Sequence, residues 1–534
     1  MRYKAILFDT RSIQSYIFSG NQLKTNIGAS YLVERVFDDV LLPALRSVLG
    51  EDALDAETWM NVEEPRWDEM STAARVGYIG GGNALLLFRA ETAEETLRAV
   101  VTAFTKELIV RMPGLHTGAA IGELDLAADG SFVGEKNLTA LVHALKDGQN
   151  TVFPLVNVPS IGLTLTCQES GETANAWDET ERRFYAWEVE MKLRADRRDS
   201  REAPAEAELM KKLSSVLPAA ERDHFLSGYV FPMEFAELGQ RQTENDIAVV
   251  HIDGNNMGRK FQDCRTLTAR KNMSRAIRSK TIAAFTELVQ NIIADFDAYE
   301  DELSIGRDRE QRPFLPIRPL VLGGDDMTFV CAAKVAVRYT RFIMDRLKDS
   351  GIASCGGITI MNTNYPFFRG YQMAEELCGA AKKCMRDLEA AAGQETASCW
   401  LDYAILHGEQ APTLDQFRAE EYRGARGDLH FGPYRVDAPA DAQESLDALL
   451  SCVRGMRALP RSKVKELRRV LAYGEHEQRQ FMAQLAHLRK SDPGMRLPSV
   501  PAWQAYEETL WAEGRTPYVD AIELMDYTLA DEEV

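Results

Sequence analysis

The stretch Arg318–Val330, RPLVLGGDDMTFV, contains two apolar runs separated by two glycines and two aspartates. Each apolar run has the length of a strand and the glycines favour a tight turn, so the stretch predicts a β-hairpin. A hairpin turn needs only one acidic residue beside its glycine. Asp325 and Asp326 need a further explanation, because adjacent carboxylates repel each other unless a cation lies between them.

This hairpin lies within a regular order of predicted strands and helices. The elements predicted in chain order are a strand at 246–253, a helix at about 271–297, hairpin strands at 317–322 and 327–333, a helix at 334–349, a strand at 354–361 and a helix at 367–390. The order β-α-β-β-α-β indicates a ferredoxin-like domain, in which the first strand lies beside the hairpin. We therefore expect Asp253, at the end of the first strand, next to Asp325 and Asp326.

The N-terminal region repeats this order. Its predicted elements are a strand at 3–10, an amphipathic helix at 28–49, a glycine-rich hairpin at 75–88 and a strand at 116–126. AILFDT is similar to AVVHID, and IGGGNALLLF is similar to LGGDDMTFVC, in the same order, which indicates a duplicated module. The first copy has Gly82 and Asn83 where the second has Asp325 and Asp326, so it has lost the paired acids.

The composition is that of an ordinary globular protein, with 45% hydrophobic and 27% charged residues. The 534 residues exceed what one core usually serves, so we expect two or more domains. No apolar run approaches ~20 residues, and the N-terminal MRYKAILFDT is typical of a strand rather than a signal peptide. The eight cysteines show no pairing pattern. We expect a cytoplasmic protein with no membrane partner.

The formal net charge is −19. A protein whose whole surface holds nucleic acid nonspecifically is basic, so this class is excluded. An anionic ligand remains compatible with local backbone N–H groups, metal ions or a small basic patch. The sequence contains no G-x-x-x-x-G-K-[ST] motif, which argues against a P-loop kinase or ATPase.

Asp253, Asp325 and Asp326 form a candidate metal site. Clustered carboxylate oxygens suit Mg²⁺ or Mn²⁺. Phosphoryl-transfer enzymes of the palm type use such acids to hold two metals about 4 Å apart. Gly323 and Gly324 keep the hairpin free of side chains, so a nucleotide can lie against its backbone.

The segment Asp253–Gly258, DGNNMG, follows the first strand directly and offers a short turn of backbone N–H groups for phosphates. Each signal alone has a structural explanation, because a lone GGDD is most often a turn and the lysines of AAKK (380–383) most often a solvated face. The whole combination, in palm order, favours the metal site.

Several stretches resemble a known family: HIDGNNMG (251–258), LPIRPLVLGGDDMTFV (315–330) and CGGITIMNTNYPFFRGYQMAEELCGAAKK (355–383). They resemble the palm domain of the large subunit of type III CRISPR effector complexes, the CRISPR polymerase or cyclic oligoadenylate synthase. FDTRSIQSYIFSGNQLKTNIGASYL (8–32) and GYIGGGNALLLF (77–88) are similar to its first, inactive palm. Diguanylate cyclases share a palm and a related glycine-rich motif, but not two palms in one chain.

The resemblance implies an α+β fold with two ferredoxin-like palm, or nucleotidyl cyclase, domains. The expected domains are an inactive palm-like domain at 1–125, an insert with helices and a degenerate cysteine motif at 126–228, a catalytic GGDD palm at 229–403 and a helical domain at 404–534.

The resemblance also implies a role for each motif position. Asp253, Asp325 and Asp326 would hold Mg²⁺ or Mn²⁺. The positions implied to bind nucleotide are Gly323, Gly324, Asn256, Met257, Gly258, Ser274, Lys382, Lys383 and, in the first palm, Gly81, Gly82 and Asn83. The implied reaction is attack of a ribose hydroxyl on an α-phosphate, with release of pyrophosphate.

The sequence departs from the family in two respects. It contains no adjacent His-Asp pair, so we expect no HD nuclease domain. CQESGETA, from Cys167, resembles one arm of a zinc motif, but no cysteine pair completes it, so we expect a remnant without metal. His251 is interpreted as a packing residue rather than a ligand.

The leading hypothesis is a nucleotidyltransferase that makes cyclic oligoadenylate-type messengers from ATP. The alternatives are a nucleotide-binding scaffold subunit of an RNA-guided complex and a standalone cyclic-dinucleotide synthase. The implied partners are ATP or another NTP, and other CRISPR effector subunits with guide and target RNA. The base, the ring size, the linkage, the activating trigger and the oligomeric state stay open.

Overall fold

The computed structural model describes residues 1–61, 65–134, 137–151, 162–179, 181–196, 204–222, 224–239, 245–394, 396–408 and 413–529. The chain forms two compact units, each assembled from separate segments. The first unit comprises Met1–Arg222, Asn256–Ala283 and Leu320–Asp325, and the second comprises Asp223–Asn255, Ala284–Pro319 and Asp326–Val534. The bounds of the four domains expected from the sequence stay predictions.

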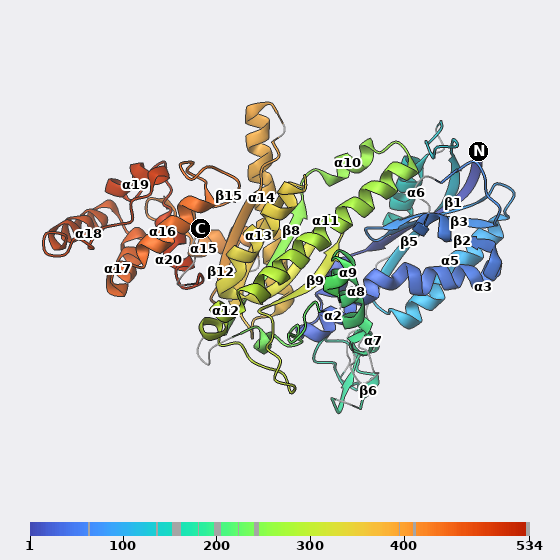
Figure 1. Ribbon diagram of the computed structural model, residues 1–534, viewed down its shortest axis with the longest axis horizontal. Coiled ribbons are helices and arrows are strands. Elements are labelled where there is room, and N and C mark those ends of the chain that lie inside the picture. Colours follow the sequence, from blue (N-terminus) through green and yellow to red (C-terminus); the bar gives the residue numbers. More distant parts are fainter. Residues whose placement is uncertain are drawn as a thin grey trace. The chain divides into compact units, whose positions relative to one another are not determined.

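The first unit contains a five-stranded sheet (Figure 1). Its strands in spatial order are β2 (Leu54–Asp55), β3 (Ala74–Gly80), β4 (Asn83–Arg89), β1 (Arg2–Arg11) and β5 (His116–Asp125). β1 runs antiparallel to β4 and to β5. Apart from the short edge strand β2, this is the ferredoxin-like order, with the fourth strand beside the first and the hairpin beyond it.

Helices cover both faces of this sheet. The ring of Phe8 in β1 lies 5.0 Å from that of Phe104 in α5 (Glu94–Arg111). The preceding residue, Leu7, belongs instead to a buried cluster with Leu141 of α6 (Leu138–Thr151). Because successive strand residues point to opposite faces, α5 and α6 lie on opposite sides of the sheet.

The remaining helices and strands of the first unit are short or peripheral to the sheet. The predicted helix at 28–49 is a continuous helical run with a π-helical centre: α2 (Leu23–Arg35), Val36–Leu41 and α3 (Leu42–Leu49). The other elements are α1 (Ile13–Ile17), α4 (Glu57–Asn61), β6 (Ala176–Asp178), β7 (Arg183–Tyr185), α7 (Trp187–Asp196), α8 (Pro204–Ser215), α9 (Ala219–Arg222) and α10 (Met257–Asp263). Parts of the predicted insert, 152–161 and 197–203 among them, lie outside the described residues.

A six-stranded sheet carries the GGDD hairpin. Its strands in spatial order are β15 (Tyr434–Arg435), β12 (Trp400–Leu406), β11 (Ser354–Asn362), β8 (Asp246–Gly254), β10 (Asp326–Ala332) and β9 (Ile317–Gly323). β8 is antiparallel to both β10 and β11. The predicted ferredoxin-like arrangement is confirmed, and the α+β fold class with it.

Two adjacent glycines show how this sheet is covered. A Cβ on Gly356 of β11 would meet Thr340 and Met344 of α13 (Ala336–Asp349). A Cβ on Gly357 would lie 2.0 Å from the backbone oxygen of Ala374 in α14 (Phe367–Ala392). α13 and α14 therefore lie on opposite faces, and glycine at 357 is required because the backbone of α14 rests directly on the strand.

The region after β11 and α14 extends the sheet before it becomes helical. β12 pairs in parallel with β11, so the predicted boundary after Tyr403 falls inside a strand. The part of the chain from Ala404 onward, expected to be mainly helical, also contains the end of β12 and the short strands β13 (Arg423–Gly424), β14 (Gly427–Asp428) and β15. The strands escape a sequence reading because β13–β15 are only two residues long.

Helices dominate the rest of the chain, shown in orange and red in Figure 1. They are α15 (Leu414–Glu421), α16 (Leu446–Met456), α17 (Arg461–Leu471), α18 (Glu475–Leu488), α19 (Gln504–Thr509) and α20 (Tyr518–Leu524). The two other helices between β8 and β9 are α11 (Leu267–Ala294) and α12 (Phe296–Leu303). Among the residues described, none of the helices combines the length and apolarity needed to cross a bilayer.

Candidate active site

The end of β8 and the start of β10 bring two carboxylates together. Asp326 is the direct antiparallel partner of Asp253, and Thr328 is the partner of His251. Alternate residues share a face of a strand, so these four side chains lie on one side of the sheet. This is the side that α14 covers, because Gly357, which contacts α14, is the partner of His251 on β11.

α14 supplies a cation to this pair of carboxylates. The Lys382 ammonium donates a hydrogen bond to Asp253 Oδ2. Burial alone would lower the pKa of Lys382, but the charge and hydrogen bond of Asp253 raise it above the ordinary lysine value. Lys383, the other predicted phosphate contact, is exposed. The structure thus brings Lys382, and not Lys383, to the acids.

His251 contacts the second carboxylate from inside the sheet. Its Nδ1 lies 3.3 Å from Asp326 Oδ1 and 3.2 Å from Thr328 Oγ1. The ring is 4% exposed, and burial lowers its pKa against the opposing charge of Asp253. The interpretation of His251 as a packing residue omitted this contact. The sequence indicates this contact only through the position of His251, two residues before Asp253 on the same strand.

The tip of the GGDD hairpin belongs to the first unit. Gly324 has φ +62°, and a Cβ at that position would meet nothing within 4 Å. Gly323 is similarly open, with only Val321 at 3.9 Å. The Thr281 hydroxyl donates to the Gly324 carbonyl oxygen at 2.7 Å. The tip is therefore bare, and Asp325 follows it as a partly buried residue.

The proposed phosphate turn lies at the start of α10. Asn256 has φ +59°, in the left-handed region, and Met257 begins the helix with a buried side chain. Gly258 is exposed, and a Cβ there would meet nothing within 4 Å. The turn thus leaves its outer face unobstructed.

The first unit repeats the carboxylate geometry with different residues. Asn83 is the antiparallel partner of Asp9, as Asp326 is of Asp253. Gln149 of α6 donates its Nε2–H to Asp9 Oδ2 at 3.2 Å, where α14 offers Lys382 in the second unit. Gln149 was missed in the sequence because α6 has no counterpart among the motifs that were compared.

The glycine-rich hairpin of the first unit lies against α11. Gly81 has φ +59° with no atom within 4 Å of an added Cβ, whereas a Cβ on Gly82 would lie 2.6 Å from Ile13 Cδ1. Ser274 Oγ lies 3.1 Å from the Cβ position of Gly80. The structure therefore places Ser274 beside Gly80, the residue that precedes Gly81 in this hairpin.

No protein-family model and no curated protein matches the sequence. Solved structures do match. Csm1 in a Csm1–Csm4 cassette in complex with cA3 is 12% identical over 99% of this chain and 70% of that chain, with a TM-score of 0.50. The chain has the fold of Csm1. Csm1 is the Cas10-type subunit of type III Csm complexes, so the resemblance inferred from the sequence is confirmed at the level of the fold.

Other Csm1 structures match over a similar range. Csm1 in T. onnurineus is 13% identical over 99% of this chain and 70% of that chain, with a TM-score of 0.49. Csm1 in a cassette in complex with cA4 is 12% identical over 92% of this chain, with a TM-score of 0.47, and only 63% of that chain is covered. The chain therefore spans about two thirds of the length of these Csm1 chains.

Within the Csm1 fold, the residues that suit a divalent cation are the facing carboxylates. Asp253 and Asp326 offer oxygen ligands of the kind that Mg²⁺ and Mn²⁺ prefer, and the ammonium of Lys382 already marks the position as one that attracts positive charge. The donor set thus fits a hard cation. In the described part of the chain, no three His, Cys, Asp or Glu side chains stand close enough to form a complete metal cluster.

The predicted cysteine motif is part of a small core. Cys167 is buried and packs with Tyr185, Val189 and Leu193. Its backbone N–H and carbonyl both bond within the turn that ends at Glu172. This local packing accounts for the buried position of the thiol.

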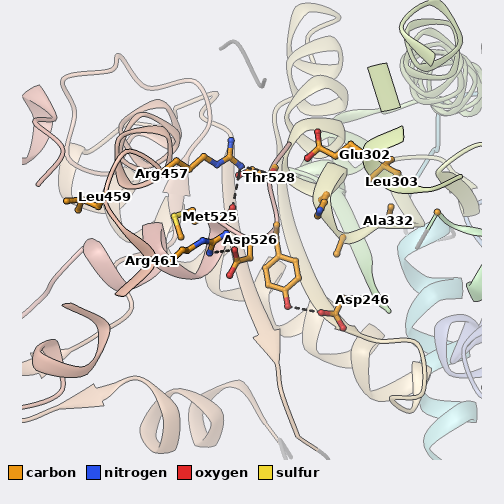
Figure 2. A pocket seen from close by; sticks show the side chains of 14 residues that line it. Asp246, Glu302, Leu303, Ala332, Arg457, Leu459, Arg461, Met525, Asp526 and Thr528 are labelled. Atoms are coloured by element: carbon orange, nitrogen blue, oxygen red, sulfur yellow. Dashed lines mark hydrogen bonds and ion pairs between the residues drawn. The ribbon is translucent and has the colours of Figure 1, made fainter. Parts of the chain in front are cut away.

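A cavity of about 620 Å³ in the second unit lies at the opposite end of β8 (Figure 2). Asp246, on its wall, is seven residues from Asp253, or roughly 23 Å along the strand. The Tyr527 hydroxyl donates to Asp246 Oδ2 at 2.8 Å, and Arg461 pairs with Asp526 at 2.5 Å. The bond from Tyr527 to Asp246 joins the C-terminal segment to β8 at the wall of this cavity.

An ionic cluster with a buried histidine and two buried aspartates includes Asp402 of β12. The two ring nitrogens of His430 lie 2.9 Å from Asp402 Oδ1 and 3.1 Å from Asp520 Oδ1. Burial opposes the charged ring, but the two carboxylates raise the pKa of His430 to about 9. Asp402 also pairs with Arg418. The two carboxylates of this cluster are balanced by the His430 ring and the Arg418 guanidinium, which indicates a structural role.

Proposed function

We propose that this chain is a metal-dependent nucleotidyltransferase that converts ATP to cyclic oligoadenylate-type products. The observation that carries the proposal is the register that sets Asp326 opposite Asp253 beside a bare Gly-Gly turn. A scaffold has no need for two facing carboxylates, because their mutual repulsion costs stability unless a cation is bound.

Different residues of the chain would bind the metal and the nucleotide in this reaction. Asp253 and Asp326, joined by the neighbouring Asp325, would hold Mg²⁺ or Mn²⁺, which when bound lowers the pKa of the attacking hydroxyl and neutralises charge on the triphosphate. The open backbone at Gly323 and Gly324 leaves room for the nucleotide.

The triphosphate end needs its own contacts. The backbone N–H groups of Asn256, Met257 and Gly258 would donate hydrogen bonds to the β- and γ-phosphate oxygens, and Lys382 would move from Asp253 to a phosphate oxygen. A ribose hydroxyl then forms the new bond to the α-phosphorus as the bond to the pyrophosphate oxygen breaks, and the hydroxyl proton leaves to solvent.

The partners follow the same proposal. The matched Csm1 structures include cassettes with Csm4 and complexes with cA3, cA4 and AMPPNP. We extend to this chain ATP as the substrate, other effector subunits with guide and target RNA as partners, and a role in CRISPR-type antiviral defence. Gly81, Gly82, Asn83 and Ser274, which all belong to the first unit, are proposed to contact the second nucleotide.

Two other functions fit part of the same observations. A nucleotide-binding scaffold would bind ATP without turnover, and a standalone cyclic-dinucleotide synthase would use the same carboxylates on another base. Incubating the purified protein with each NTP in turn and Mn²⁺, followed by mass analysis, separates the three. Adenylate oligomers with pyrophosphate support the proposal, a dinucleotide of another base supports the synthase, and bound but unchanged ATP supports the scaffold.

A further inference from the structure

The segment Arg454–Arg496 is basic within an acidic chain. It contains eleven arginines and lysines but four aspartates and glutamates, a formal charge of +7, whereas the whole chain carries −19. The segment includes α17 and α18, in the orange and red part of the chain in Figure 1. A local excess of positive charge attracts an anionic partner even when the protein as a whole is acidic.

The outer face of α17 carries part of this charge in a regular row. The buried inner face of the helix is formed by Val464, Leu467, Val470 and Leu471. Arg461, Lys465 and Arg469 are exposed and follow one another at intervals of four residues, so they share the outer side of the helix. Neighbouring members lie about 6 Å apart along the helix axis. A row of evenly spaced cations matches a polymer with evenly spaced anions.

Two members of this row have no partner of their own. Arg461 pairs with Asp526. Within the part of the chain that the structure describes, Lys465 and Arg469 make no ion pair and no side-chain hydrogen bond. Both charges are therefore available to another molecule.

A groove of about 410 Å³ between α17 and α18 lies beside the row. Arg469 lines it together with Tyr473, Gln480 and Gln484. Tyr473 is 51% exposed, so its ring offers a surface on which a nucleic-acid base can stack. The side-chain amides of Gln480 and Gln484 can both donate and accept hydrogen bonds at base edges.

The acids of the groove indicate how a strand would lie. Glu466 is paired with Lys463 at 2.7 Å, and Glu477 belongs to the first turn of α18. Phosphates avoid these carboxylates and favour the outer row, so the bases of a bound strand would turn toward the groove.

We infer that the outer face of α17 and the adjoining groove bind single-stranded RNA, with Lys465 and Arg469 at phosphates and Tyr473 against a base. The inference goes beyond the ATP reaction, and it rests on the proposed function only for the choice of RNA as the polymer. A duplex has no unstacked base to offer Tyr473. An acidic protein would meet the cations but leave the aromatic side of the groove unused.

The test is binding of a fluorescein-labelled single-stranded RNA of about 15 nucleotides to the full chain, measured by anisotropy from about 50 to about 200 mM salt. EDTA is present throughout, so the metal-dependent ATP site does not contribute. Lys465→Gln with Arg469→Gln removes two cations and keeps good helix formers. Arg98→Gln with Lys106→Gln, at exposed positions of α5, is the control with the same change in net charge.

We expect the α17 double variant to bind RNA about tenfold more weakly at about 50 mM salt. Its salt slope, log affinity against log salt, should be shallower by about 1.4, since each phosphate contact on a single strand contributes about 0.7. Tyr473→Leu should weaken binding about fivefold or more without changing the slope, because stacking releases no counterions. The α5 control and Asp326→Asn should bind as the parent does. Melting temperatures check folding, and either α17 or Tyr473 variant carries the test if the other does not fold.

Equal losses in the α17 and α5 double variants would reveal a general charge effect and overturn the inference, as would a parent that does not bind RNA at the lower salt. Binding of labelled polyglutamate through Lys465 and Arg469, without RNA binding, would assign the face to an acidic protein instead. Failure of the proposed function gives a different result. A parent that binds RNA through α17 but makes no product from ATP contradicts only the proposed function, and the reverse outcome rejects only the role of α17.

Discussion

Asp326 lies directly opposite Asp253 across the antiparallel strands β8 and β10. The same register in the first unit sets Asn83 opposite Asp9. The duplicated module therefore keeps its backbone pairing in both copies, but only the second copy has a carboxylate on both strands. An amide cannot replace a carboxylate as a charged ligand, and of these two facing pairs Asp253–Asp326 is the one that offers two carboxylates.

Metal ions should matter more than ionic strength for ATP binding. The protein carries a formal charge of −19, so the charge of the triphosphate has to be offset locally. We expect EDTA to abolish ATP binding, and a rise from about 50 to about 200 mM salt to weaken it less than about tenfold, unlike a protein with many phosphate contacts. Calorimetry with and without EDTA is the measurement, and tight binding in EDTA would contradict the site.

Lys382→Met should separate metal binding from nucleotide binding. Lys382 pairs with Asp253, so a cation has to displace the ammonium and the variant should bind Mn²⁺ alone at least as tightly as the parent. ATP binding should weaken about tenfold or more, because a charge-assisted hydrogen bond to phosphate contributes about 1.5–3 kcal/mol. Lys383→Met, at an exposed position of the same helix, is the control. A loss of ATP affinity in both variants alike would argue against a specific role for Lys382.

The two glycines of the first hairpin should differ in tolerance. Gly82 has φ +78°, and a Cβ would lie 2.6 Å from Ile13 Cδ1, so Gly82→Ala should cost about 1–3 kcal/mol in the free energy of unfolding. Gly81→Asn should cost about 1 kcal/mol or less, because Asn tolerates the left-handed region and the space is open. Urea unfolding measures both. If Gly81→Asn folds normally yet makes product at the parental rate, the first hairpin does not contact a nucleotide.

The buried cluster of His430 predicts a pH dependence of stability. Asp402 and Asp520 face the ring, and Arg418 pairs with Asp402. The folded pKa of about 9 lies above an unfolded pKa of about 6.5. The stabilisation is therefore complete below pH 6.5 and is lost as the pH rises through 9, by on the order of 3 kcal/mol.

The check on this cluster is the melting temperature across that pH range. The parent should melt at progressively lower temperature from pH 6.5 to 9. His430→Asn should melt lower at pH 6.5 but change less with pH, since it has no ring to deprotonate. Parallel curves for the two proteins would show that His430 does not carry its charge in the folded state.

Much of the fold could be predicted from the sequence because strand and turn patterns are local. The hairpin at Arg318–Val330 and the strand ending at Asp253 follow from apolar runs and glycines, and the ferredoxin-like order then places them side by side. β12 was missed as part of the sheet because a parallel strand pairs at long range, and its partner cannot be seen in its own residues.

The site was predictable only where backbone register decides it. The backbone register of β8 and β10 places Asp326 opposite Asp253, and this does not depend on side-chain packing. The choice of Lys382 over Lys383 depends instead on the rotation of α14, and the contact of His251 with Asp326 depends on side-chain packing against Tyr371. Gly357 is the sequence signal for the close approach of α14, because a glycine inside a strand marks a place where another backbone comes close.

The most direct test is the product that the full chain makes from ATP with Mn²⁺, compared between the parent and Asp326→Asn. Asparagine keeps the shape of the side chain and removes a carboxylate that repels Asp253, so the variant should melt no lower than the parent. We predict adenylate oligomers and pyrophosphate from the parent, and about a hundredfold less or none from the variant, since a bound metal contributes several kcal/mol to such a step. Equal product from both proteins, or a parent that binds ATP and never joins two nucleotides, would contradict the account.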